Sequence, residues 1–214
     1  MSAAERPPHL QRHHGPAGCL LALVATVCAD LPAADGVPPA QVIATAAEVF
    51  ASIVAERRVE LEADLREDHA LVDEYLLPHF DLTSACRLIL RDHWKTATPE
   101  QRRRFVDAFY RYLLASYGDA LLEFRHDTIK VLPVQQDTIG SSTRVRTQMK
   151  LTGGSVFDVD YYMRRDDRGW LIVDVIAEGI SYVRTYRSEY GLEIRSEGLE
   201  ALTARLEEAA AQKQ

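Results

Sequence analysis

The sequence predicts an α+β fold in which a helical half packs over a curved, four-stranded antiparallel sheet. From Pro38 to Gly118 apolar residues recur at helical spacing, whereas after Gly118 they alternate with polar residues, as in half-buried strands. Short turn-forming stretches such as "TGG" and "RDDRG" join the strand segments, and connections this short indicate antiparallel hairpins. At 214 residues the chain is long enough for one domain with extensions.

Four helices are expected in the first half. The second runs through "DHALVDEYLLPHFD" and stops at Pro78, and the third spans about residues 82–94. The fourth starts at a capping box, because Thr98 stands at the N-cap and Gln101 three residues later. The first has an apolar stripe formed by Val42, Ala46, Val49 and Ile53. The stripe of the fourth comprises Phe105, Phe109, Tyr112, Leu113 and Tyr117, with Gly118 ending or kinking the helix.

The second half contains four expected strands: "TIKVLPV", "STRVRTQMKL", "SVFDVDYYMRR" and "GWLIVDVI". In the third, Asp158 and Asp160 alternate with the apolar residues and should be exposed on the other face. The fourth strand is apolar on both faces, so both should be covered. A short helix from Tyr182 to Tyr190, closed by Gly191, and an amphipathic C-terminal helix complete the order. The C-terminal helix carries Leu199, Leu202 and Leu206.

The N-terminus has the pattern of a secretory signal peptide. Arg6 and Arg12 precede an apolar run from Gly18 to Ala29, which is shorter than the about 20 residues that cross a bilayer. We therefore expect a cleaved signal at residues 1–29, ending no later than about residue 35, and export to the periplasm. A single domain would follow at residues 37–208, with a flexible tail at 209–214. The alternative is an N-terminal membrane anchor.

Composition excludes several kinds of site. The net charge of −7 disfavours nucleic-acid binding, which needs clustered basic residues on one face. Cys86 is the only cysteine outside the predicted signal, and the histidines outside the signal lack metal-binding spacing, so no metal is expected. Ser181 has no histidine near it in sequence to act as a base. No catalytic residue is assigned.

The stretch "GWLIVDVIAEGISYVRTYRSEYG" is interpreted as a strand-to-helix corner. Gly179 suits a sharp turn, and Ser181 suits the N-cap of the helix at Tyr182. Asp174, late in an apolar strand, needs a partner, and we expect Arg184 or Arg187 on the following helix to supply it.

The same stretch resembles the signature of the MlaC, or toluene-tolerance, family of periplasmic phospholipid-binding proteins. Upstream, "LLPHFD" is similar to the family's Leu-x-Pro-x-x-Asp, with its aspartate at Asp81, and "HWKTATPEQRRRF" is similar to its Trp-x-x-Ala-x-x-Glu-Gln-x-x-x-Phe. The resemblance covers about Val37 to Leu206, and Tyr182 stands where an aliphatic residue is usual. The signature positions are Trp170, Ile172, Asp174, Val175, Glu178, Gly179, Ser181, Val183, Tyr186 and Arg187.

The resemblance implies a monomeric periplasmic carrier with an apolar cavity between helices and sheet. It would bind phospholipid, need no cofactor, and exchange lipid between an outer-membrane lipoprotein complex and an inner-membrane MCE-domain ABC transporter, which maintains outer-membrane lipid asymmetry. Architectural roles fall to Asp81, Asp174, Gly179, Ser181 and Arg187. The candidate lipid-binding residues are Phe109, Val131, Val145, Thr147, Met149, Phe157, Val159, Tyr161, Met163, Ile172, Tyr182 and Tyr186.

The alternating pattern alone favours a close-packed core, and only the resemblance favours a cavity. Two alternatives to a carrier therefore stay open, an enzyme and a ligand-free adaptor. An enzyme with an NTF2-like cone would need polar side chains pointing inward, and the third strand offers only Tyr161 there. A ligand-free periplasmic adaptor would bind no lipid at all.

Overall fold

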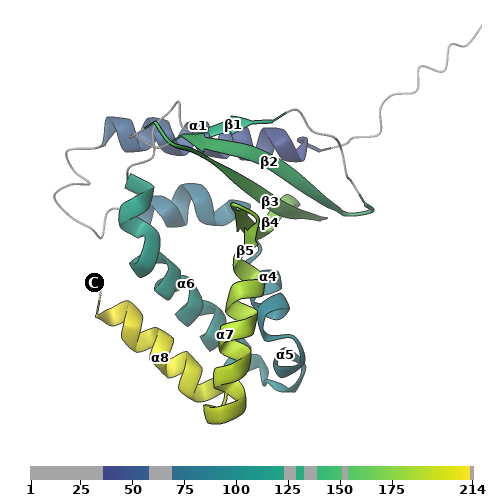
Figure 1. Cartoon of the computed structure of the whole chain (residues 1–214), viewed down its shortest axis with the longest axis vertical. Helices are drawn as coiled ribbons and strands as arrows, with labels where there is room; N and C mark the ends of the chain where they lie inside the picture. Colours follow the sequence, from purple (N-terminus) through teal and green to yellow (C-terminus); the bar gives the residue numbers. More distant parts are fainter. Residues whose placement is uncertain (1–35, 58–68, 123–128, 133–138, 151–153, 213–214) are drawn as a thin grey trace, which may run out of the picture. The chain divides into compact units, whose positions relative to one another are not determined.

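The computed structural model describes residues 36–57, 69–122, 129–132, 139–150 and 154–212 (Figure 1). All of them fall within the unit Asp35–Gln214. The predicted signal peptide lies outside the described residues.

Helix α1 (Pro39–Glu56) begins with proline at its first turn, where the missing N–H costs no hydrogen bond. Its apolar face contacts β1, β2 and η1, although by length and composition alone the helix could cross a membrane. The predicted stripe is wrong by about one residue, because Phe50 points inward while Val49 is 41% exposed. The buried positions are Ile43, Ala46, Phe50, Ala51 and Val54.

The next helical segments are more broken than the sequence predicts. A π-helical turn, η1 (Val72–Leu76), passes into a 3₁₀ turn, η2 (Leu77–His79). The expected single helix at residues 82–94 is two helices, α4 (Leu82–Leu90) and α5 (Asp92–Thr96). Arg91 separates them because its φ of +49° lies outside the helical region.

Helix α6 (Pro99–Leu122) confirms the predicted capping box. The Gln101 amide nitrogen donates to Thr98 Oγ1 at 3.2 Å, and the Thr98 amide nitrogen donates to Gln101 Oε1 at 2.8 Å. The helix continues past Gly118, so this glycine does not end it, which was one of the two outcomes expected there. One glycine costs only about 1 kcal/mol in a helix, which the long buried face of α6 outweighs.

The sheet has five strands in the order β1-β2-β3-β4-β5, and each strand pairs antiparallel with the next. The fifth strand, a two-residue pairing at the corner, was not predicted. A register shift between Tyr162 and Met163 marks a bulge in the β3–β4 pairing, which increases local twist. The strands are β1 (Ile129–Val131), β2 (Ser142–Lys150), β3 (Val156–Asp166), β4 (Gly169–Ala177) and β5 (Ile180–Ser181).

The two faces of the sheet are occupied largely as the alternation predicts. In β4 Leu171, Ile172 and Val173 are all buried, so both faces of this strand are covered. In β3 Asp158 is exposed, but Asp160 is only 8% exposed, which contradicts its predicted exposure. Arg144 on β2 donates to its carboxylate and covers it.

The C-terminal helices are longer than expected. Helix α7 (Tyr182–Glu197) runs through Gly191, which was predicted to close it, because its buried stripe continues to Ile194. Gly198, with φ of +90°, ends the helix in a conformation that other residues rarely adopt. Helix α8 (Leu199–Ala211) then includes residues 209–211, which were predicted to be part of a flexible tail.

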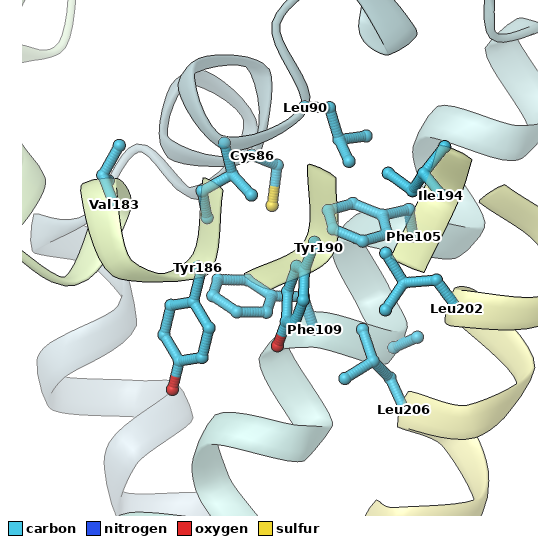
Figure 2. Close-up of a cluster of buried hydrophobic side chains, with 12 residues drawn as sticks. Cys86, Leu90, Phe105, Phe109, Val183, Tyr186, Tyr190, Ile194, Leu202 and Leu206 are labelled. Carbon is cyan, nitrogen blue, oxygen red and sulfur yellow. The ribbon is translucent and has the colours of Figure 1, made fainter. Parts of the chain in front are cut away.

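A hydrophobic cluster, with its buried aromatic rings on α6 and α7, joins α4, α6, α7 and α8; α6 lies against α8 and α4 against α7 (Figure 1). Figure 2 shows Tyr186 and Tyr190 of α7 beside Phe109 of α6. The Phe109 ring lies edge-on to both tyrosines, with centroid distances of 5.1 Å to Tyr186 and 6.2 Å to Tyr190. Edge-to-face pairs stabilise a core beyond simple burial of apolar area.

Candidate functional site

A cavity of about 430 Å³ lies between one face of the sheet and the helices. Its walls come from α1, η1, η2, α4, α6 and α7 on the helical side and from β1, β3 and β4, with Met149 of β2, on the sheet side. Lys and Arg are missing from the described residues that line it, and most of the lining side chains are apolar. A cavity of this volume is within the roughly 300–1,000 Å³ typical of small-molecule sites.

Eight of the twelve candidate residues line this cavity. They come from α6, from the sheet and from the start of α7, which are brought together by the packing of α7 against β4. The structure places them at the cavity, and their contact with a ligand stays a prediction. They are Phe109, Met149, Phe157, Val159, Tyr161, Ile172, Tyr182 and Tyr186.

The other four candidates do not line the cavity. Val145 and Met163 are fully buried in a close-packed cluster with Ile43, because the N-terminal half of α1 covers that part of the sheet. Val131 packs against the same cluster. Thr147 is also buried, and its hydroxyl donates to the Val159 carbonyl at 2.6 Å. The inward face of the sheet is thus part core and part cavity wall.

Few individual residues of the helical wall were among the candidates predicted from the sequence. The cavity is lined by Ala47 and Phe50 of α1, Leu76 of η1, Phe80 just after η2, and Ala85 of α4. The apolar periodicity of these segments was the available signal. It shows that a face is buried, but a core and a cavity wall have the same pattern.

Most polar groups at the cavity already have partners. The Tyr110 hydroxyl donates to the Asp73 carboxylate. Burial raises the pKa of Tyr161 to about 12, so the phenol is neutral at physiological pH. Burial lowers the pKa of His79, which favours its neutral imidazole. The cavity lining therefore contains little charge.

The corner between β4 and α7 is held by Asp174. Its carboxylate accepts from the Ser181 hydroxyl at 2.5 Å and from the Val183 amide nitrogen at 3.0 Å. Ser181 is the N-cap, since its hydroxyl oxygen accepts from the Arg184 amide nitrogen at 3.1 Å. The expected ion pair with Arg184 or Arg187 is wrong: the carboxylate accepts instead from two donors at the N-terminus of α7, and Arg187 donates to the Leu88 carbonyl.

The remaining corner residues also have structural contacts. Arg187 donates from Nε to the Leu88 carbonyl at 2.9 Å and so ties α7 to α4. Asp81 caps α4 by accepting from the Ser84 amide nitrogen at 2.9 Å. The turn uses Gly179, at φ of +79°, directly after Glu178, at φ of +48°. Each contact orients a helix that forms part of the cavity wall.

Reactive groups are sparse in the part of the chain that the structure describes. It contains no cluster of three His, Cys, Asp or Glu side chains able to hold a metal ion. Cys86 is fully buried, and burial raises the pKa of its thiol, which keeps it protonated and unreactive.

These features define a class of protein: an α+β fold that holds an apolar cavity between its helices and an antiparallel sheet. Within this class the chain belongs to the MlaC protein family, whose model matches residues 44–208.

Two relatives and one solved structure illustrate the similarity. The chain is 36% identical over 98 residues to the toluene tolerance protein ttg2D of Pseudomonas putida, covering 45% of this chain and 44% of that protein. It is 20% identical over 171 residues to the intermembrane phospholipid transport system binding protein MlaC of Haemophilus influenzae. This match covers 78% of this chain and 79% of that protein. The chain thus spans less than half the length of the first relative.

The structure is similar to that of a phospholipid-binding protein from Ralstonia solanacearum, solved in complex with a phospholipid. The TM-score is 0.76, with 23% identity over 83% of this chain and 99% of that one. The two chains therefore share a fold.

Proposed function

We propose that this protein is a periplasmic phospholipid carrier that encloses acyl chains in the cavity between its helices and sheet. It exchanges lipid between two membrane complexes, an outer-membrane lipoprotein complex and an inner-membrane MCE-domain ABC transporter. It acts as a monomer without a catalytic step, and the lipid is its only ligand. This exchange maintains the lipid asymmetry of the outer membrane.

The observation that carries the proposal is the cavity itself. A diacyl lipid exposes roughly 30 methylenes to water, at about 0.8 kcal/mol each, so its free transfer is opposed by roughly 20 kcal/mol. A wall without Lys or Arg among its described residues replaces water around the chains with apolar side chains. Family membership and the phospholipid bound to the Ralstonia protein support the same ligand class.

The two alternatives account for less of the structure. A ligand-free adaptor has no use for an apolar cavity of about 430 Å³, whose unfilled volume costs stability. An enzyme needs an activated group facing its substrate, and the cavity tyrosines of raised pKa are neutral phenols.

Lipid occupancy tests the proposal directly. Exported protein purified without detergent should carry phospholipid, detected as an added mass in native mass spectrometry. Ala47→Phe on the cavity wall should lower this occupancy because the added ring occupies the acyl-chain volume.

A matched variant controls for the mutation itself. Ala44→Phe places the same ring on the exposed side of α1 and should leave occupancy unchanged. Wild-type protein without phospholipid would refute the proposal, as would equal occupancy in the two variants.

A further inference from the structure

Three tyrosine hydroxyls meet at one side of the cavity. Tyr117 comes from α6, and Tyr182 and Tyr186 come from successive turns of α7. The Tyr117 and Tyr186 hydroxyl oxygens are 3.3 Å apart. The ring centroids of Tyr117 and Tyr182 are 6.1 Å apart, and those of Tyr182 and Tyr186 are 6.3 Å apart. All three residues line the cavity, and we call them the tyrosine cluster.

The tyrosine cluster extends from solvent into the interior. Tyr117 is 41% exposed, Tyr182 is half-buried, and Tyr186 is only 6% exposed. Its hydroxyls therefore lie where the cavity wall changes from water-accessible to apolar. In a bound glycerophospholipid the ester groups occupy the corresponding level, between a hydrated headgroup and buried chains.

The cluster has unused hydrogen-bonding capacity. Three phenol hydroxyls carry three protons, and each oxygen can also accept. The Tyr117 and Tyr186 hydroxyls form one hydrogen bond, which uses one of the protons. A second bond from Tyr182 to Tyr117 would use another proton and still leave one O–H to donate, and among the described residues the cluster has no other hydrogen-bond partner. Burial raises the pKa of Tyr182 and Tyr186, so the hydroxyls stay protonated donors.

Other polar groups at the cavity are less suited to this contact. Asp174 already accepts from Ser181 and Val183, and Tyr110 donates to Asp73. Without Lys or Arg among the described lining residues, a phosphate has no cation to pair with inside the cavity. A neutral donor fits a neutral acceptor, which for this ligand class is the ester carbonyl.

We infer that the tyrosine cluster is a polar subsite that donates a hydrogen bond to an acyl-ester carbonyl of the bound lipid. The inference rests on the proposed carrier function and deepens it. It predicts selection at the ester linkage rather than at the headgroup. A carbonyl that accepts from the free O–H is held at the level of the cluster, so the cluster fixes how far the chains enter.

A competition between two lipids tests the inference. Delipidated protein is mixed with equal amounts of a diester phosphatidylglycerol and its diether analogue, which has the same headgroup and chain length but no carbonyls. Native mass spectrometry then gives the ratio of the two bound lipids. Wild-type protein should favour the diester roughly three- to tenfold, the effect of one net hydrogen bond.

Variants assign the preference to the cluster. Replacing Tyr117, Tyr182 and Tyr186 together by Phe keeps the rings and should bring the ratio close to one. Tyr162→Phe, at an exposed residue outside the cavity lining, should keep the wild-type ratio. Circular dichroism checks that both variants are folded, and the ratio is an internal measure that does not depend on the folded fraction.

The outcomes separate the inference from the carrier function. Equal binding of both lipids by wild-type protein, or a preference that the triple variant retains, would overturn the inference alone. Binding of neither lipid would refute the carrier function and the inference with it.

Discussion

At the scale of single residues, Asp174 contributes most to the geometry of the site. Its two hydrogen bonds, to the Ser181 hydroxyl and the Val183 amide, fix the direction in which α7 leaves the sheet. A carboxylate at a helix N-terminus also interacts favourably with the helix dipole. Since α7 supplies Tyr182 and Tyr186 to the cavity, this corner sets the position of one wall.

Removing the carboxylate should therefore reduce stability. Asp174→Ala leaves the Val183 N–H and the Ser181 hydroxyl without their acceptor, and a buried unsatisfied group costs about 1–3 kcal/mol. Urea unfolding should show a decrease of this size. Asp158→Ala, at an exposed aspartate of the neighbouring strand, should change the free energy of unfolding much less. Equal effects of the two substitutions would contradict the role assigned to Asp174.

At the scale of elements, local signals located most helices and strands but not all their ends. The capping box at Thr98 predicted the start of α6 correctly, because both of its hydrogen bonds are local. The break at Arg91 could not be predicted, since nothing in its neighbours requires a positive φ there. Gly191 and Gly198 are equally plausible helix ends in sequence, and only the packing of Ile194 distinguishes them. The pairing of β5 depends on the tertiary corner, which short-range patterns do not encode.

The two glycines of this region should respond oppositely to alanine. Gly191 is helical, and an added Cβ would meet Arg195 Nη1 at an ordinary 3.6 Å, so Gly191→Ala should stabilise by about 0.5–1 kcal/mol. Gly198 has φ of +90°, so Gly198→Ala should destabilise by roughly 1–3 kcal/mol through backbone strain. Urea unfolding of both variants measures this difference. Shifts of the same sign would contradict the assigned end of α7.

At the scale of the whole molecule, the sequence predicts which residues point inward but not what they face. Val159 and Met163 occupy the same face of β3 and have the same alternation. Met163 is packed against Ile43 of α1, whereas Val159 lines the cavity. This difference depends on where α1 crosses the sheet, a long-range contact that periodicity does not report. For the same reason four of the twelve candidates belong to the core or its edge.

The most direct test of the central claim is the phospholipid bound per folded protein in Val159→Glu, with Met163→Glu as the matched comparison. A carboxylate at the cavity wall can be hydrated, so Val159→Glu should remain folded by circular dichroism and lose its lipid. At Met163 the same charge is buried in a close-packed core, so Met163→Glu should unfold the protein. A Val159→Glu variant that unfolds as Met163→Glu does, or that folds and retains its lipid, would contradict the account.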